Sequence, residues 1–260
     1  SSMPQGTATA TATAATKCEQ TLAAADAEND ASGGEGEGSL PEFPLAHIRD
    51  EYRRHFAQAD EKVDRRPCVL LSTGAMCPVH KGHVDMMIRA KRAMEKNGFS
   101  VLGGWISPSH DKYVGPKMKA GGHLFAGAGH RAQCVHLATK HLDWLNVSTW
   151  ESTHLDGNRW IDFDEVVDNA EKFLNSQEFV NTKCPIVVVY VCGTDHAAKC
   201  GLFRGFRKDC QGVAVVTRAG KKYDRASIKD LVFMVEEHNP ECAHISSTGV
   251  RSAFASSRYY

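Results

Sequence analysis

Short apolar runs alternate with segments of helical periodicity along most of this chain. The run Cys68–Leu71 is followed by Gly82–Lys96, in which apolar residues recur at helical spacing. The run Ile186–Cys192 is almost unbroken and rich in valine, which is typical of a strand buried on both faces of a parallel sheet. Strands that alternate with helices of this length predict βαβ units, and therefore an α/β fold with a doubly wound, mostly parallel sheet of five to six strands.

The same patterns predict the remaining elements. Further strands are expected at Phe99–Ile106, Val147–Trp150 and Gly212–Thr217, helices over about Leu45–Lys62, around Cys134–His141, over Phe163–Leu174 and around Ile228–Val235, and a glycine-rich loop at Gly115–Gly129. On the helix around Cys134–His141, the expected apolar face comprises Cys134, Leu137, Ala138 and His141. Ligands of such sheets bind beyond the carboxyl ends of the strands, so the residues that follow each apolar run are the candidates for a site.

The first 40 residues differ from the rest of the chain. They contain no aromatic residue, and their composition of mainly Ala, Thr, Gly and Ser cannot bury enough apolar surface to offset the entropy of ordering. We therefore expect a disordered low-complexity tail at residues 1–40 and one folded domain at residues 41–260, with its core beginning at about residue 68.

Charge and cysteine usage narrow the class of protein. The chain has 31 Lys and Arg against 31 Asp and Glu, which argues against a nucleic-acid-binding protein. No apolar run approaches the roughly 20 residues that a membrane span requires. The nine cysteines are scattered without a C-x-x-C pair, and the first residues resemble neither a secretory nor a mitochondrial leader. The cytoplasm or the nucleus is therefore the expected location.

The segment after the first predicted strand has the residues of a phosphate site. It reads Gly74-Ala75-Met76-Cys77-Pro78-Val79-His80-Lys81-Gly82-His83. His80 and His83 lie one helical turn apart at the expected start of a helix, where free backbone N–H groups and the helix dipole also favour an anion. Gly74 permits a turn, and Gly82 leaves room for a base or ribose against the helix. The alternative is that the two histidines bind zinc, although no third ligand lies close in the sequence.

A second candidate phosphate site lies about 160 residues further along the chain, at Ile245-Ser246-Ser247-Thr248-Gly249-Val250-Arg251. Ser246 and Ser247 are natural N-cap residues, and they would open a helix with its backbone N–H groups directed at a phosphate. Arg251 follows about one turn later, where its guanidinium could bind the β- and γ-phosphates of a triphosphate. A Ser-Ser-Thr sequence alone is an ordinary helix cap, so it indicates a phosphate site only in combination with the first segment.

These two segments resemble the H-x-G-H and I-S-S-T-x-x-R motifs of the nucleotidyltransferase superfamily. Other segments resemble one branch of it, the eukaryotic-type nicotinamide mononucleotide adenylyltransferases. They are Ile106–Tyr113, similar to I-S-P-x-x-D-x-Y; Thr149–Ser152, similar to T-W-E-S; Cys192–Asp195, similar to C-G-x-D; and Val216–Gly220, similar to V-T-R-A-G. The resemblance covers roughly Cys68 to Phe254 and implies a Rossmann-like nucleotidyltransferase fold.

The resemblance also implies roles for individual residues. His80, His83 and Arg251 would be catalytic residues that contact the phosphates. ATP would be bound by Gly74, Ala75, Met76, Gly82, Gly193, Asp195, Ser246, Ser247 and Thr248. The mononucleotide would be bound by Trp150, Ser107, Lys112, Glu151 and Phe206, with Trp150 stacking on the pyridine ring. No protein side chain is expected to bind a metal, because Mg²⁺ would be carried by the phosphates of ATP. Trp150 could instead be a core residue, and Asp195 a helix N-cap.

The sequence departs from the family pattern at several of these positions. Met76 and Cys77 stand where the family usually has an aromatic residue and Asp or Asn, and Cys77 could make the site sensitive to oxidation. Val114–Gly115 replaces family lysines, which leaves Lys112 or Lys117 to contact the mononucleotide phosphate.

Two further departures lie later in the chain. Phe206 takes the place of a second family tryptophan and keeps a ring for stacking. The sequence ends at Tyr260, soon after Arg251, where the family usually continues, so either the chain is truncated or this branch is short.

The implied reaction joins ATP and nicotinamide mononucleotide, or its acid form, into NAD, or its deamido form, and pyrophosphate. A phosphate monoester with a second pKa near 6 is already a dianion at neutral pH, so it attacks the α-phosphate in line without a general base. The expected partners are these small molecules, with neither nucleic acid nor membrane, and the family often assembles into homo-oligomers. The alternatives are a related enzyme with another phosphate acceptor, or a nucleotide-binding protein without turnover. The first loop lacks the G-x-G-x-x-G of a dehydrogenase.

Overall fold

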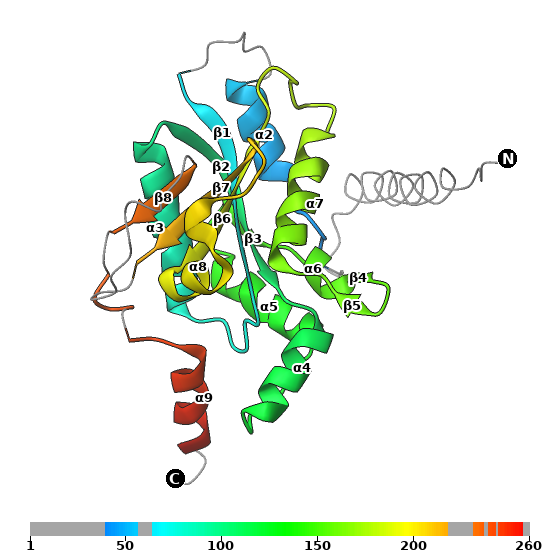
Figure 1. Ribbon diagram of the computed structural model, residues 1–260, viewed down its shortest axis with the longest axis vertical. Coiled ribbons are helices and arrows are strands. Elements are labelled where there is room, and N and C mark those ends of the chain that lie inside the picture. Colours follow the sequence, from blue (N-terminus) through cyan, green and yellow to red (C-terminus); the bar gives the residue numbers. More distant parts are fainter. Residues whose placement is uncertain (1–39, 57–63, 218–230, 237–238, 243, 257–260) are drawn as a thin grey trace, which may run out of the picture. The chain divides into compact units, whose positions relative to one another are not determined.

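A six-stranded sheet forms the centre of the described part of the chain (Figure 1). The computed structural model describes residues 40–56, 64–217, 231–236, 239–242 and 244–256. Within them the strands lie in the order β3-β2-β1-β6-β7-β8, and each neighbouring pair is parallel. Their bounds are β1 Arg66–Gly74, β2 Phe99–Pro108, β3 Leu145–Val147, β6 Val187–Gly193, β7 Gln211–Val216 and β8 Val232–Val235. The predicted α/β fold with a doubly wound parallel sheet is confirmed.

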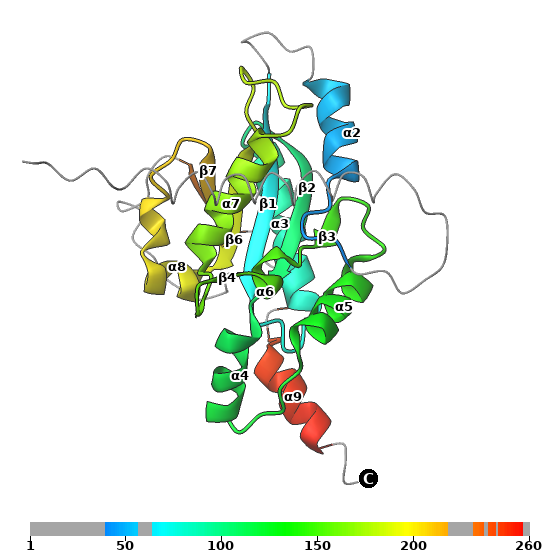
Figure 2. The same ribbon diagram turned by 90° about the vertical axis from the view of Figure 1, so that its right-hand side faces the viewer.

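Helices cover both faces of this sheet, because successive side chains of a strand point to opposite sides. In β1, Val69 and Leu71 belong to one apolar cluster, and Cys68 and Leu70 belong to the other. Helices α2, α7 and α8 contribute to the first cluster, and α3 and α5 to the second. Figure 1 shows α2 and α7 on one side of the sheet and α3 on the other, and Figure 2 gives the perpendicular view. The helix bounds are α2 Ala46–His55, α3 Lys81–Lys96, α5 Ala128–Thr139, α7 Phe163–Asn175 and α8 Thr194–Cys200.

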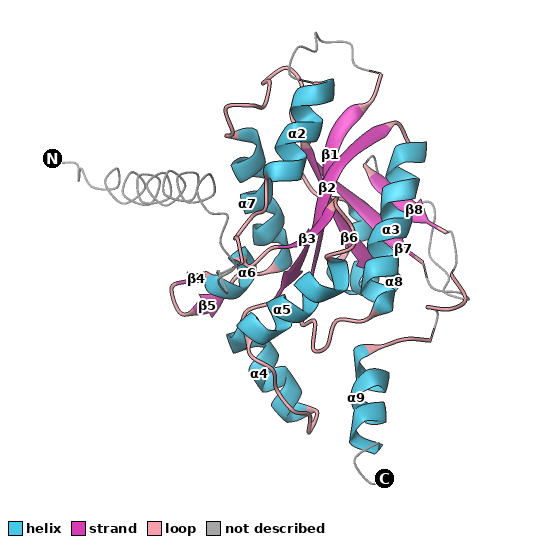
Figure 3. Cartoon of the chain, turned by 180° about the vertical axis from the view of Figure 1, so that it is seen from behind, coloured by secondary structure: helices cyan, strands magenta, loops and turns pink. Residues whose placement is uncertain are grey.

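The remaining elements are short. They are α4 Asp111–Ala120, α6 Trp150–Thr153, the antiparallel pair β4 Leu155–Asp156 and β5 Arg159–Trp160, a 3₁₀ helix at Leu202–Arg204, and α9 Ser247–Ser256. Seen from behind, α4 and α9 lie at the end of the sheet where β1 and β2 terminate (Figure 3). None of the helices in the described ranges has the length and apolar character needed to cross a membrane. Residues 1–39 of the tail expected at residues 1–40, and residues 57–62 of the expected helix, lie outside the described part of the chain.

The predicted helix around Ile228–Val235 is wrong over the part that the structure describes. Val232–Val235 is strand β8, which pairs with β7 in the register Val213↔Val232 to Val216↔Val235. The spacing of Val232 and Val235 fits one turn of a helix, but both side chains are also buried at the two ends of a four-residue strand. Backbone pairing with β7, which sequence periodicity does not report, decides for the strand. Residues 228–230 lie outside the described part.

The predicted glycine-rich loop at Gly115–Gly129 is also wrong in its first part, which is helical. Helix α4 begins after His110, whose Nδ1 accepts the backbone N–H of Lys112 at 3.0 Å, and it continues through Pro116 to Ala120. Val114 and Met118 are buried against the side chain of Cys77. This apolar contact holds a helix together even though Gly and Pro disfavour one.

Two smaller expectations need correction. Strand β3 ends at Val147, and Trp150 begins α6 rather than ending a strand. On α5, Leu137 of the predicted apolar face is 52% exposed, and the buried residues are Arg131, Ala132, Val135 and Thr139. The buried face of α5 therefore includes an arginine, whose guanidinium finds hydrogen-bond acceptors inside the molecule.

Candidate functional site

The candidate residues gather where the order of the strands reverses. Strands β1 and β6 are neighbours, and each is joined through helices to strands on its outer side, so the loops after them leave the sheet in opposite directions. In open α/β sheets this reversal creates a crevice at the carboxyl ends of the two strands, and ligands bind there. The H-x-G-H segment follows β1, and Gly193 and Asp195 follow β6.

The two histidines form the beginning of α3. The Nδ1 of His80 accepts the backbone N–H of Gly82 at 3.1 Å, and the Nδ1 of His83 accepts the backbone N–H of His80 at 3.2 Å. The ring centroids lie 3.9 Å apart. Because each Nδ1 accepts a hydrogen bond, the proton of each neutral ring is assigned to Nε2. The pair can therefore present two Nε2–H donors, which suits phosphate oxygens.

Gly82 also makes a close contact that the sequence did not predict. A Cβ at this position would lie 3.1 Å from Cε1 and Nδ1 of the His80 ring. Gly82 therefore makes room for the capping imidazole itself. Within the described residues, no group of three His, Cys, Asp or Glu side chains is arranged to hold a metal ion, so the zinc alternative for the two histidines gains no third ligand.

The second phosphate motif contacts the first. The Ser246 hydroxyl accepts the backbone N–H of Gly249 at 3.1 Å, as an N-cap does, and the Ser247 hydroxyl donates to the carbonyl of Pro78 at 2.9 Å. Arg251 donates from Nη1 to the carbonyl of Cys77 at 2.6 Å and from Nη2 to the Thr248 hydroxyl at 3.0 Å. The two motifs, far apart in the sequence, thus lie side by side.

The neighbouring side chains explain two of the departures from the family pattern. The Cys77 side chain is buried and packs against Val114 and Met118, so its backbone oxygen, not its thiol, faces Arg251. Burial shields this thiol from oxidants. Met76 is buried and has a positive φ of 46°, and a Cβ at Gly74 would lie 3.3 Å from its Cε. Gly74 and Met76 therefore shape the turn together.

At the end of β6 the backbone is open. Gly193 is the N-cap residue of α8, and a Cβ placed there would meet no atom within 4 Å. Asp195 lies exposed in the first turn of α8, so the predicted alternative of Asp195 as the N-cap is wrong. The space beside Gly193 suits a ligand that approaches the backbone closely.

Trp150 is partly a core residue. Its ring is stacked on His154, with centroids 5.0 Å apart and planes at 18°, and on Phe43, at 5.8 Å and 23°. The indole is half-buried against the cluster that contains Phe43. A pyridine ring that stacks on Trp150 would share the indole with these two rings.

The neighbouring Glu151 is a buried carboxylic acid. It is 3% exposed, and its Oε2 accepts the hydroxyl of Ser107 at 2.8 Å, while Ser107 is fully buried. Burial raises the pKa of Glu151 from 4.5 to about 7, although hydrogen bonds from Ser109 and Ser107 and the charge of Arg131 act in the opposite direction. Near neutral pH this group can therefore change its protonation state inside the molecule.

Arg131 is an important residue that the sequence analysis missed. Its side chain is 1% exposed and reaches from the first turn of α5 to the carbonyl of Ala75 in the first motif at 2.7 Å and to the carboxylate of Asp111 at 2.7 Å. The signal in the sequence was weak, since an arginine near a helix start reads as an exposed residue.

The remaining residues predicted to contact the mononucleotide have partners within the protein. Lys112 bonds to the backbone and side-chain oxygens of Asn158, and Lys117 lies over the Tyr113 ring, 5.4 Å from its centroid. Phe206 lines a hollow of about 340 Å³ together with Gln211 and Leu231, beside the amino ends of β7 and β8. The Phe206 ring also lies 6.3 Å from the ring of Tyr190 on β6, whose hydroxyl bonds to Thr73 near the carboxyl end of β1, so its stacking role stays a prediction.

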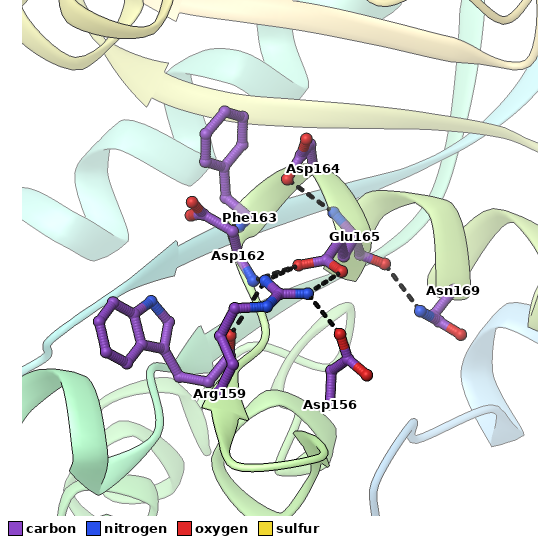
Figure 4. Close-up of polar contacts among 8 residues, drawn as sticks. Asp156, Arg159, Asp162, Phe163, Asp164, Glu165 and Asn169 are labelled. Atoms are coloured by element: carbon purple, nitrogen blue, oxygen red, sulfur yellow. Dashed lines mark hydrogen bonds and ion pairs between the residues drawn. The ribbon is translucent and has the colours of Figure 1, made fainter.

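The β4–β5 hairpin is held beside this region by charged side chains (Figure 4). Arg159 donates from Nη1 and Nη2 to the two carboxylate oxygens of Glu165 on α7, at 2.7 and 2.8 Å, and from Nη2 to Asp156 at 2.7 Å. Glu165 also accepts the backbone N–H of Asp162, completing a capping box at the start of α7. On its other side the hairpin meets α4, where the Trp160 and Tyr113 rings lie 5.7 Å apart.

Comparison with known proteins gives a consistent result. The chain is 38% identical over 84 residues to nicotinamide/nicotinic acid mononucleotide adenylyltransferase 2 of Xenopus tropicalis, which covers 32% of this chain and 25% of the relative. It is 29% identical over 132 residues to nicotinamide/nicotinic acid mononucleotide adenylyltransferase of Arabidopsis thaliana, covering 51% of each. It is 30% identical over 131 residues to the protein of that name from Oryza sativa subsp. japonica, which covers 50% of this chain and 48% of the relative. The matched segments thus span a quarter to about half of the length of these relatives.

A family model described as Cytidylyltransferase-like matches residues 71–253 of this chain, from β1 to α9. The match therefore includes both phosphate motifs and the sheet that positions them. The chain belongs to the cytidylyltransferase-like family.

Proposed function

We propose that this protein is an adenylyltransferase that joins ATP and nicotinamide mononucleotide, or its acid form, into the dinucleotide and pyrophosphate. The observation that carries the proposal is the direct contact between α9 and the loop after β1, in which Ser247 and Arg251 bond to Pro78 and Cys77. This contact gathers imidazole, guanidinium, hydroxyl and helix N-terminal donors around one crevice. The names of the plant and vertebrate relatives support the choice of acceptor.

In the proposed reaction, a phosphate oxygen of the mononucleotide attacks the α-phosphorus of ATP in line. A new P–O bond forms as the bond between the α-phosphorus and the oxygen of pyrophosphate breaks, and the electron pair leaves with pyrophosphate. The attacking phosphate is already ionised near neutral pH, so the protein has to align two anions and stabilise the charge that develops. His80, His83 and Arg251 would do so through N–H donors.

The donor set fits phosphate oxygens better than a bare divalent cation, because it consists of N–H and O–H groups. We therefore propose that Mg²⁺ arrives on the triphosphate, where it supplies positive charge to the phosphate oxygens. Gly74, Ala75, Met76, Gly82, Gly193, Asp195, Ser246, Ser247 and Thr248 are proposed to surround ATP, and Trp150, Ser107, Lys112 and Glu151 the mononucleotide.

The proposal extends to the setting of the reaction. Its partners would be small molecules, without nucleic acid or membrane, and copies of the chain would assemble as the family often does. The cysteine pattern supports the cytoplasm or the nucleus as the location.

The test is turnover with matched variants. Purified protein, ATP and Mg²⁺ are incubated with nicotinamide mononucleotide and, separately, with its acid form, and dinucleotide and pyrophosphate are followed. The variants are His83→Ala and His83→Asn. The Asn side chain keeps an oxygen close to the position of Nδ1, where it can accept the His80 N–H, but it lacks an Nε2–H.

Stoichiometric dinucleotide and pyrophosphate from the wild type, strongly reduced in both variants, is the expected result. If Asn restores turnover to the wild-type level, the histidine acts only as a helix cap and its catalytic role fails. If neither acceptor reacts while ATP still binds, the adenylyltransferase assignment fails in favour of another acceptor or of a protein that binds nucleotides without turnover.

A further inference from the structure

Arg131 is the most completely buried charged side chain near the site. Its side chain is 1% exposed, yet three of its nitrogens donate hydrogen bonds. Nε donates to the carbonyl of Ala126 at 2.9 Å, Nη1 to the carbonyl of Ala75 at 2.7 Å, and Nη2 to the carbonyl of Ser109 at 2.6 Å and to Oδ1 of Asp111 at 2.7 Å. These hydrogen bonds compensate for the cost of removing the charged guanidinium from water.

The acceptors of Arg131 belong to different loops. Ala75 lies in the loop after β1, which leads to His80, and Ser109 and Asp111 lie where β2 passes into α4. These two loops touch each other directly, since the backbone N–H of Ser109 donates to the carbonyl of Gly74 at 2.8 Å. Arg131 thus links the first turn of α5 to the first residue of α4, and both helices lie toward this end of the sheet (Figure 3).

We propose that Arg131 is a positioning residue of the adenylyl-transfer site, which fixes the phosphate loop after β1 against the start of α4 and places a permanent positive charge beside Glu151. The inference rests on the proposed function, because the two loops matter to catalysis only if they carry the two substrates. Arg131 acts through the backbone carbonyl of Ala75 and so through the path of the chain toward His80.

The electrostatic part of the proposal follows from the groups around Glu151. Ser107 and Ser109 donate hydrogen bonds to its carboxyl group from the end of β2, Arg131 faces it from α5, Asp162 from the start of α7, and Tyr190 from β6. Among these, Arg131 supplies the positive charge that lowers the pKa of Glu151, and Asp162 raises it. Without the guanidinium, only the serine hydrogen bonds would counter the effects of burial and Asp162, and the pKa of Glu151 would rise further.

The geometry also separates arginine from lysine. The three nitrogens of the planar guanidinium of Arg131 donate hydrogen bonds to the carbonyls of three different residues and to one carboxylate. A lysine has one nitrogen with three donors, so it keeps the charge near Glu151 but cannot hold both loops in the same way.

The experiment compares Arg131→Lys and Arg131→Met with the unsubstituted protein, and uses Arg53→Met on the exposed face of α2 as the matched control. Folding is checked by thermal unfolding, and kcat and the KM of each substrate are measured per folded molecule. The pKa of Glu151 is read separately by ¹³C NMR of carboxyl-labelled glutamate, which needs no turnover. Turnover of the wild type reports on the proposed function, and the ratios between variants report on this inference.

We expect kcat to fall about tenfold in Arg131→Lys and about a hundredfold in Arg131→Met, with smaller changes in KM, because displaced reacting groups cost this much in rate. The pKa of Glu151 should rise above its value of about 7 in the Met variant and stay in the Lys variant. Folded variants with the kcat and Glu151 pKa of Arg53→Met would overturn the proposal. Failure of the Lys variant to fold would also overturn it, because Arg131 would then serve stability alone.

Discussion

The loops of the candidate site are held in two different ways, one in the interior and one at the surface. Around the loop after β1, Arg131, Arg251 and Ser247 donate hydrogen bonds to backbone carbonyls. At the β4–β5 hairpin, Arg159 bonds to the carboxylates of Glu165 on α7 and Asp156 on β4. The Arg131 side chain is 1% exposed and the Arg159 side chain 49%. The same residue type thus makes a similar number of bonds in opposite surroundings.

This difference in exposure determines whether pH or salt affects the stability of each region. A buried polar group that loses its partner cannot bond to water instead, so each interior bond is costly to break and salt screens it much less. Exposed charges exchange protein partners for water at little cost, and salt weakens them. The phosphate loop should therefore respond to the protonation of buried groups, and the hairpin to ionic strength.

The largest effect that sharpens this comparison concerns Glu151. Its pKa is raised to about 7 in the folded protein, from an ordinary 4.5, because of burial. The unfolded chain therefore ionises first as pH rises, and the folded protein loses stability between pH 4.5 and about 7, by about 3 kcal/mol in all. Glu151→Gln is neutral at every pH and should avoid this loss.

The measurement is the free energy of unfolding in urea at pH 5 and pH 8. The Gln variant should gain about 2.5 kcal/mol relative to the wild type between these two values of pH, because part of the loss already occurs below pH 5. The exposed Glu178→Gln serves as the control, with no comparable gain. A difference between wild type and Glu151→Gln that stays constant with pH would contradict the buried, shifted carboxyl group.

A smaller effect tests how tightly the phosphate loop is packed. In Gly82→Ala the new Cβ lies 3.1 Å from the His80 ring, which must move by a few tenths of an ångström. Because small displacements of reacting groups slow catalysis, kcat should fall about tenfold, although alanine favours the helix. Gly129→Ala on α5 is the control, because a Cβ there meets nothing within 4 Å. Equal turnover of both variants would mean that the loop yields easily.

Sequence reasoning succeeded where the structure depends on neighbours in the chain. The role of Ser246 as a helix cap requires only a backbone N–H group three residues further on. The strand at Ile186–Cys192 could be predicted because a continuous valine-rich run suits a buried parallel strand. Both phosphate motifs were therefore placed on the correct kind of element before their contact was known.

Sequence reasoning failed where contacts between distant segments decide the local structure. The inward turn of Arg131 depends on carbonyl groups of Ala75 and Ser109, which lie 56 and 22 residues away in the sequence. Val232–Val235 became a strand because β7 lies beside it. The stacking of Trp150 on Phe43 likewise joins segments that no local pattern relates. The interior of the site is thus the part that the sequence predicts least, since it is made of such long-range contacts.

The smallest expected effect belongs to the surface contacts. In Arg159→Gln the hairpin loses its bonds to Glu165, so the midpoint of thermal unfolding should fall by less than about 3 °C at low salt. The fall should vanish in 1 M NaCl, where the Debye length is about 3 Å. It should also vanish at low pH, because the pKa of Glu165 is lowered to about 2 by Arg159, so the stabilisation is present above the ordinary pKa of 4.5 and is lost as pH falls toward 2. Arg53→Gln, at an exposed position of α2, controls for the loss of one positive charge. A large decrease in Arg159→Gln that persists in salt would show that the hairpin is held as firmly as the interior, and the distinction between the two regions would fail.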